Sequence, residues 1–100
     1  MIVYEVNLDI DRTIADAYRD WLQAHVAEML ALPGFVDARC HEVVDDPPDP
    51  LRLRLCVHYR LQDLAALERY LREHAPRMRA DGVARFGDGF RASRRVLRET

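Results

Sequence analysis

A carboxylate and an imidazole in two neighbouring predicted strands are the first candidates for chemistry. Asp37 faces His58 if paired residue numbers in this hairpin sum to 95, and a carboxylate beside an imidazole can hold the ring as a general base. Asn7 and Arg54 fall on the same face and could stabilise an anion. Cross-strand pairs of opposite charge also stabilise sheets without any catalysis. Asp37 and His58 are therefore candidate catalytic residues, and the alternative is that they form an ordinary structural ion pair.

Three further candidates lie on the predicted helices. Trp21 and His25 lie on the apolar stripe of the first helix, and His74 lies on the flank of the second helix, just before Pro76. Each of these residues could bind a ligand or could simply be buried in the core, because a buried histidine usually forms a hydrogen bond with a neighbouring group. His25 and Glu28 lack a third ligand of suitable type and spacing. We therefore expect neither a metal nor a cofactor.

The run Ser93-Arg94-Arg95 near the end of the chain offers an anion-recognition site together with the corner at His74. Guanidinium groups suit this role because their fork of donors matches a carboxylate or a phosphate. Pairing of these arginines with Glu73 or Asp88 is the interpretation that the sequence favours. Arg94 is kept as a candidate ligand-binding residue.

The residue types that are missing exclude several enzyme classes. All 15 basic residues are arginine, which excludes Schiff-base chemistry, pyridoxal attachment and a phosphate-loop lysine. Ser93 is the only serine and lacks a Gly-x-Ser-x-Gly context. Cys40 and Cys56 are too few for a zinc ribbon and too far apart for a redox Cys-x-x-Cys pair. Their predicted positions on opposite sheet faces also argue against a disulfide.

Size and charge indicate one ordinary globular domain over residues 1–100, with 49% hydrophobic residues and a net charge of −2. Residues 1–50 carry 11 acids and 3 arginines, whereas residues 51–100 carry 6 acids and 12 arginines. Complementary neighbouring elements explain this asymmetry better than a nucleic-acid surface. No apolar run approaches the roughly 20 residues that span a bilayer, and a signal peptide is not recognisable. We expect a cytoplasmic protein that binds neither nucleic acid nor a membrane.

Hydrophobic periodicity predicts six elements in the order strand, helix, strand, strand, helix, strand. The second helix is interrupted by Pro76 and continues briefly beyond it. A turn over residues 45–50 joins the second and third strands. The predicted strands are Ile2 to Ile10, Phe35 to Val44, Leu51 to Arg60 and Phe90 to Leu97, and the helices run from Ile14 to about Leu32 and from Asp63.

This order is the ferredoxin-like βαββαβ pattern of the α+β class. It predicts an antiparallel four-stranded sheet of order 4-1-3-2 with two helices on one face, where each helix buries its apolar stripe. The other face then carries charged and polar side chains, among them Glu5, Asn7, Arg54 and His58. Such a face is either solvated, as in many antiparallel sheets, or the lining of a polar pocket between two sheets.

Several spaced signatures resemble domain-of-unknown-function family 4286 over the whole chain. They are Tyr4-Glu5-Val6, Trp21-x3-His25-x3-Met29-Leu30, Tyr70-x3-His74-Ala75-Pro76, and Phe86-Gly87-Asp88-x-Phe90-x-Ala92-Ser93-Arg94-Arg95-x-Leu97. The resemblance implies a dimeric α/β barrel, in which two ferredoxin-like subunits press their helix-free sheet faces together. It carries no activity over, because relatives by fold include cofactor-free monooxygenases, haem-degrading enzymes and isomerase-like proteins. Haem-degrading relatives use an asparagine, a tryptophan and a histidine, but Trp21 and His25 share one helix here, so those roles are not transferred.

Three hypotheses of function are considered at this point. One is a homodimer that binds a small molecule at its polar sheet face, including a cofactor-independent oxygenase or isomerase. Another is a non-catalytic homodimer whose charged residues serve assembly. The third is a haem or metal binder through His25 or His74, which a Soret band or a stoichiometric metal in the purified protein would reveal. Glu5, Asn7, Arg54, Trp21, His25, His74 and Arg94 are the candidate ligand-binding residues.

Overall fold

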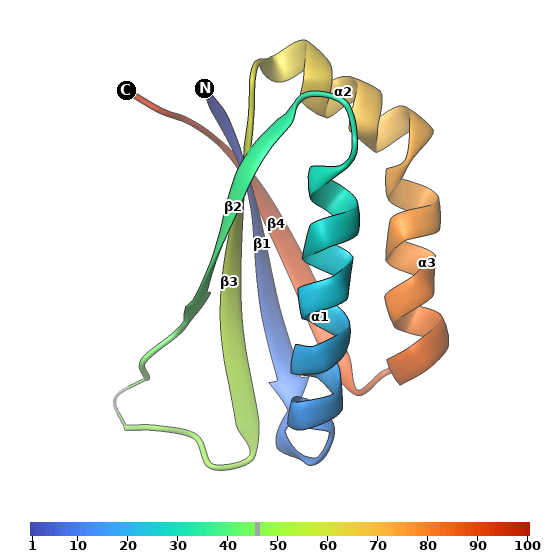
Figure 1. Ribbon diagram of the computed structural model, residues 1–100. Helices are drawn as coiled ribbons and strands as arrows, with labels where there is room; N and C mark the ends of the chain where they lie inside the picture. Colours follow the sequence, from blue (N-terminus) through green and yellow to red (C-terminus); the bar gives the residue numbers. More distant parts are fainter. Residues whose placement is uncertain (46) are drawn as a thin grey trace.

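A computed structural model describes residues 1–45 and 47–100 as one sheet covered on one side by helices (Figure 1). The sheet is antiparallel and its strand order is β2-β3-β1-β4, which confirms the predicted order. Asp46, part of the predicted turn, lies outside the described residues. The elements are β1 (Ile2–Asp11), a 3-10 turn η1 (Arg12–Ile14), α1 (Ala15–Leu30), β2 (Phe35–Glu42), β3 (Arg52–Leu61), α2 (Leu64–Glu73), α3 (Ala75–Phe86) and β4 (Phe90–Arg98).

Helix boundaries follow local capping chemistry. Asp11 accepts a hydrogen bond from the Thr13 backbone N–H at 3.0 Å and begins the 3-10 turn before α1. Asp63 caps α2 by accepting from the Ala66 backbone N–H at 2.9 Å. The predicted interruption at Pro76 is confirmed, because α2 ends at Glu73 and Pro76 stands in the first turn of α3, where no intrahelical donor is lost.

The hydrophobic core lies between the sheet and the helices. Alternate residues of the central strands β1 and β3 face it, and these include Ile10, Val57 and Leu61, all fully buried. From the helices, Tyr18, Met29 and Leu67 are buried against them. The same alternation sends the charged residues of these strands to the helix-free face, as predicted.

The hairpin register differs from the expected one. Asp37 pairs with Arg60 and Arg39 with His58, so paired numbers sum to 97 and not to 95. Phe35 pairs with Leu61, a sum of 96, so the β-bulge between Phe35 and Asp37 accounts for one residue of this difference. Phe35 packs its ring against Tyr59, while Val36 is 41% exposed. Because the shift is two residues, every later side chain of β2 keeps its predicted face.

The two cysteines are free and lie on opposite faces of the sheet, as the register argument predicted. Cys40 borders a groove with Leu22 and Val26 on the helix side, and Cys56 lies beside His41 on the other side. The hairpin pattern of the sequence predicts Cys40 on the core side of β2, but the structure leaves this side chain exposed because β2 is an edge strand.

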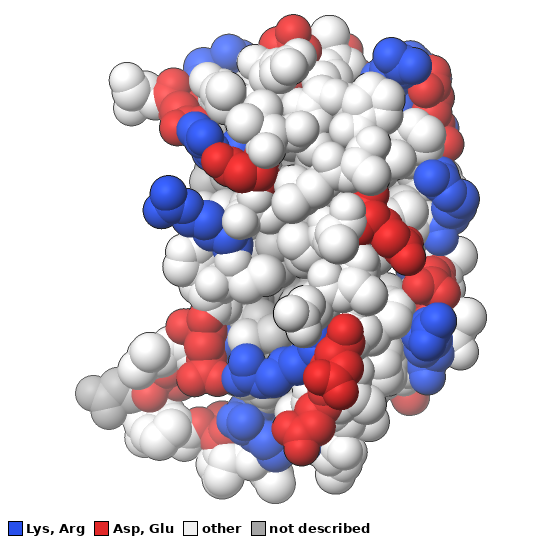
Figure 2. Space-filling model, in the orientation of Figure 1, with Lys and Arg blue, Asp and Glu red and all other residues white. Residues whose placement is uncertain are grey.

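The charged halves of the sequence face each other as neighbouring strands. Arg52 donates to Asp9 at 2.8 Å, and Arg60 pairs with Asp37 at 2.7 Å. On the face seen in Figure 2, arginines and carboxylates alternate and do not gather into a patch of one sign. Within the part of the chain that the structure describes, no helix combines the length and hydrophobicity needed to cross a bilayer.

Candidate functional site

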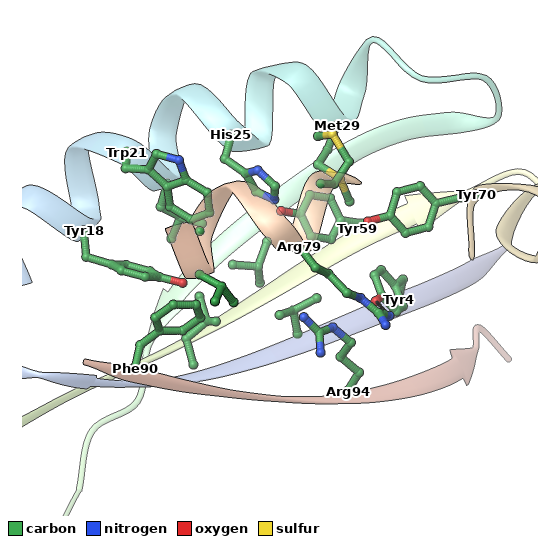
Figure 3. A pocket seen from close by; sticks show the side chains of 17 residues that line it. Tyr4, Tyr18, Trp21, His25, Met29, Tyr59, Tyr70, Arg79, Phe90 and Arg94 are labelled. Atoms are coloured by element: carbon green, nitrogen blue, oxygen red, sulfur yellow. Dashed lines mark hydrogen bonds between the residues drawn. The ribbon is translucent and has the colours of Figure 1, made fainter. Parts of the chain in front are cut away.

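A cavity of about 240 Å³ lies between the helices and the sheet. Its walls come from the helix-facing residues of the strands and from the inner faces of α1, α2 and α3 (Figure 3). We call it the helix–sheet cavity. It is lined by Tyr4, Val6, Leu8, Tyr18, Trp21, Leu22, His25, Met29, Val57, Tyr59, Tyr70, Met78, Arg79, Gly82, Val83, Phe90 and Arg94.

Aromatic rings form one end of the helix–sheet cavity. Tyr18 and Trp21 project from the same side of α1, with ring centroids 5.3 Å apart, and Phe90 from β4 lies 5.0 Å from Tyr18. These spacings are typical of favourable tilted aromatic pairs. Burial raises the pKa of Tyr18 and raises that of Tyr70 to about 12, so both phenols stay neutral near pH 7. The walls therefore offer flat, uncharged surfaces.

Trp21 is fixed in position from both helices. Its indole N–H donates to Oδ2 of Asp81 in α3 at 2.9 Å. Gly82 allows the close approach of α3, because a Cβ at this position would lie 3.0 Å from Cη2 of Trp21. The ring is thus held between the two helices, with one edge on the cavity.

His25 lies one helical turn beyond Trp21 and stacks on it, with ring centroids 4.6 Å apart. Its Nδ1 atom is buried and has no hydrogen-bond partner among the described residues. Burial lowers the pKa of His25 below its ordinary value of 6.5, although the nearby carboxylates of Glu28 and Asp81 oppose this effect. The imidazole is therefore neutral near pH 7 and has an unused polar atom in the wall of the cavity.

Two arginines line the same cavity from opposite layers. Arg79 comes from α3 and donates to the hydroxyl of Tyr4 at 2.9 Å. Arg94 comes from β4 and points inward, toward the side from which His25 projects (Figure 3). The predicted pairing of the C-terminal arginines with Glu73 or Asp88 is wrong: Arg95 binds Glu5, and Arg94 has no ion-pair partner in residues 1–45 and 47–100.

The polar sheet face, on the other side of the sheet, is organised around Glu5. This carboxylate accepts from Nδ2 of Asn7 at 2.9 Å, from Nε of Arg95 at 2.7 Å, and lies 2.8 Å from Nε2 of His58. Glu5 is only 4% exposed to solvent. Hydrogen bonds from Arg95 and then from Asn7 lower the pKa of Glu5 to about 2. Glu5 is therefore a permanently charged acceptor and not a proton acceptor near neutral pH.

The predicted pair of Asp37 and His58 does not form. Asp37 instead accepts two hydrogen bonds from Arg60, at 2.8 and 2.7 Å, and the ring of His58 turns to Glu5. The observed register lies two residues from the expected one, which puts Arg39 opposite His58 in the place expected for Asp37. The structure thus gives His58 a different carboxylate partner, from β1.

The remaining candidates lie apart from the helix–sheet cavity. Arg54 donates to Asp45 at 2.6 Å and borders a shallow hollow on the polar sheet face beside Asn7. His74 accepts from Arg77 at 2.9 Å, close to the surface between α2 and α3. The structure therefore brings Trp21, His25 and Arg94 together, whereas Glu5, Asn7 and Arg54 belong to the opposite face and His74 to neither site.

One cluster has donor atoms of the types that metals bind. Carboxylate, thiol and imidazole atoms of Glu5, Cys56 and His58 lie within 4.8 Å of one another. The Glu5 oxygens already accept hydrogen bonds, two of them from the guanidinium of Arg95. A cation would have to displace that positive group, so the cluster is a poor metal site.

Sequence reasoning missed Arg79 and the tyrosine walls, because it looked for a pocket on the polar face. One signal was available. Arg94 has the parity of Phe90 and Ala92, the apolar, helix-facing residues of β4. A charged residue at a position that should face the core indicates a polar group directed into the interior.

These observations define the class of protein: an α+β domain with a ferredoxin-like fold and an aromatic cavity between its helices and its sheet. The chain belongs to the family described as Domain of unknown function (DUF4286), whose model matches residues 1–100. This confirms the resemblance found in the sequence. No curated protein matches the chain.

Solved structures share this fold at low sequence identity. A proposed antibiotic biosynthesis monooxygenase from Deinococcus radiodurans superimposes with a TM-score of 0.74 and 12% identity, covering 100% of this chain and 93% of the other. SnoaB, a cofactor-independent oxygenase from Streptomyces nogalater, superimposes with a TM-score of 0.69 and 14% identity, covering 98% of this chain and 92% of the other. An ethyl tert-butyl ether D family protein from Bacillus halodurans superimposes with a TM-score of 0.70 and 17% identity, covering 100% of both chains. Identities this low establish the fold alone.

Proposed function

We propose that this protein binds a small, planar, largely apolar molecule in the helix–sheet cavity. The observation that carries the proposal is the cavity itself: aromatic and aliphatic walls with a few polar groups, among them the unpartnered Nδ1 of His25. Ligand pockets usually combine apolar walls with a small number of placed polar groups. This location differs from the polar sheet face that the sequence suggested.

The size of the cavity limits the ligand. An engineered cavity of about 150 Å³ holds one benzene ring, and the helix–sheet cavity measures about 240 Å³. One ring or two fused rings fit this volume. Flat rings also suit walls built from Trp21, Tyr18 and Phe90, because stacked and edge-on aromatic contacts add to simple burial.

A catalytic version of this function is a cofactor-independent oxygenase or an isomerase. SnoaB, described as a cofactor-independent oxygenase, has the same fold. In this chain the neutral imidazole of His25 supports the catalytic version, since a general base must be uncharged and within reach of the bound molecule. A binding protein without catalysis uses the same cavity. If the protein is an enzyme, His25→Gln should abolish turnover of a bound substrate while the substrate still binds; a binding protein shows no turnover before or after the substitution.

Pairing of two copies through the polar sheet face is the second part of the proposal. None of the helices in residues 1–45 and 47–100 covers this face, and it presents alternating charges that can match a second copy across a twofold axis. Ser93 is exposed on this face in the edge strand β4, opposite Asn7. Ser93→Arg should shift sedimentation from dimer to monomer, whereas Val96→Arg on the helix side of β4 should not. A monomeric unmodified protein would contradict the pairing.

We also propose that the protein works in the cytoplasm. The free thiols of Cys40 and Cys56 support this location, because oxidising compartments favour disulfides.

Calorimetric titration with 2-naphthamide, a neutral molecule of two fused rings, tests the ligand site. We expect saturable binding of one molecule per chain. Val6→Phe should weaken it at least tenfold, because Val6 lines the cavity and the larger side chain takes part of the space that two fused rings need. Val96→Phe is the matched control, since Val96 is 50% exposed and lies outside the cavity. Equal binding by the unmodified protein and Val6→Phe would place the ligand elsewhere, and no binding at all would overturn the proposed function.

A further inference from the structure

The charge of the helix–sheet cavity is unusual for an apolar site. Its lining includes two guanidinium groups, Arg79 and Arg94, and no Asp or Glu among the residues that the structure describes. The histidine and tyrosines of the lining do not cancel this charge, because burial keeps His25, Tyr18 and Tyr70 neutral. The lining therefore carries two positive charges without a negative one near pH 7.

Arg94 is set apart from the other arginines by its surroundings. Most arginines of the described chain bind a carboxylate, a carbonyl, an imidazole or a hydroxyl. Four have no such partner among residues 1–45 and 47–100: Arg39, Arg91, Arg94 and Arg98. Of these four, only Arg94 lines the helix–sheet cavity.

The position of the two arginines defines the mouth of the cavity. Both side chains line the cavity, yet both residues are exposed to solvent. They come from α3 and from β4, which is an edge strand, so the cavity opens between these two elements. In Figure 3, Arg94 and Arg79 point into the same region from the sheet and from the helix layer. An entering ligand passes between two positive groups.

We propose that the ligand of the helix–sheet cavity is an aromatic carboxylate whose acid group lies at the mouth between Arg94 and Arg79. This inference rests on the proposed function and adds the class of the ligand. A carboxylate matches the fork of a guanidinium through two parallel hydrogen bonds. Its aromatic body then occupies the apolar interior beside Trp21, and the buried Nδ1 of His25 can bond a polar ring substituent.

The choice of an acid over a cation or a neutral molecule follows from electrostatics. A cation would meet two like charges, and among the described residues the lining supplies no carboxylate to offset them; Asp81, outside the lining, already accepts a hydrogen bond from Trp21. A neutral ring system fills the interior but leaves Arg94 without a partner. A single carboxylate at the mouth stays partly hydrated while its rings are buried, which lowers the cost of removing the charge from water.

A pair of probes that differ only in charge tests the inference. The probes are 2-naphthoate and its neutral amide, 2-naphthamide, titrated by calorimetry against the same protein at low salt. We expect the carboxylate to bind about tenfold or more tightly, because hydrogen bonds to charged groups are stronger than neutral ones. Arg94→Gln should remove most of that difference, because glutamine can donate a hydrogen bond to either probe but carries no positive charge. Arg98→Gln, on the same strand but outside the cavity, should behave as the unmodified protein.

The outcomes separate this inference from the proposed function. Equal affinity for the two probes, or a preference for 2-naphthoate that survives Arg94→Gln, would overturn the carboxylate site and leave the apolar cavity in place. Binding of neither probe would overturn both. A loss of affinity for both probes in Arg94→Gln would show a structural role, which a thermal unfolding measurement of the same variant would confirm.

Discussion

The rings of Trp21 and His25 are stacked in α1, one helical turn apart, at a centroid distance of 4.6 Å and an interplanar angle of 22°. Trp21 is in turn bonded to Asp81 of α3 at 2.9 Å. Through Trp21, both α1 and α3 therefore contact the environment of the His25 imidazole. The sole tryptophan of the chain is therefore a reporter of the protonation of His25 and of the contents of the cavity.

Titration of Trp21 fluorescence should show a transition below pH 6.5, the ordinary value of a histidine, because burial lowers the pKa of His25. The unfolded chain binds this proton more readily than the folded one, so stability should fall as the pH drops below 6.5. His25→Gln should remove the fluorescence transition and reduce the loss of stability. A midpoint at or above 6.5 in the unmodified protein would contradict the burial of this ring.

Replacement of Glu5 by glutamine should destabilise the protein by roughly 1–3 kcal/mol, because Arg95 and His58 lose a charged acceptor in a largely buried position. Urea unfolding measures the effect, and Glu99→Gln at the exposed end of the chain is the control. The Glu5 pKa of about 2 lies below its ordinary 4.5, so its contribution is complete above pH 4.5 and is lost as the pH falls toward 2. The stability difference between the two proteins should shrink across that window. A difference that is constant from pH 6 to 2 would refute the charged role.

Gly82→Ala should keep stability within about 1 kcal/mol, since alanine favours a helix by about that amount over glycine while its methyl group crowds Trp21. Because the indole borders a cavity, it can move into the open space. Affinity for 2-naphthamide should therefore fall severalfold in calorimetry. Unchanged affinity in a folded variant would show that Trp21 does not limit the space for the ligand.

Asp37→Ala should leave ligand binding unchanged and lower stability only slightly, because the pair with Arg60 is at the surface and screened by solvent. The measurement is the same calorimetric titration combined with urea unfolding. Loss of binding in a stable variant would restore Asp37 as a site residue. It would also mean that the ligand lies on the polar sheet face.

The fold could be predicted because its signals are local. Alternation along Ile2 to Ile10, the stop at Pro33-Gly34 and the break at Pro76 each follow from the chemistry of a few neighbouring residues. The bulge at Val36 gave no such signal, since an apolar residue there fits a core position as well as a bulge. That residue accounts for one of the two positions by which the expected register missed the partner of Asp37.

The candidate site was less accessible from sequence because it depends on packing between distant elements. Glu5 meets His58 and Arg95 only through the registers of β1 with β3 and β4, which no turn connects directly. The cavity depends on how far α3 stands from the sheet, which the contact of Gly82 with Trp21 helps to set. Trp21, His25 and Arg94 could be named individually, but their convergence required the structure.

Nuclear magnetic resonance of the protein titrated with 2-naphthoate tests the central claim most directly. The chain has one tryptophan and one asparagine, so the indole N–H of Trp21 reports the helix–sheet cavity and the side-chain amide of Asn7 reports the polar sheet face. We predict a saturable shift of the Trp21 signal with an unmoved Asn7 signal. A saturable shift of Asn7 with an unmoved Trp21 would contradict the account and place the ligand on the opposite side of the sheet.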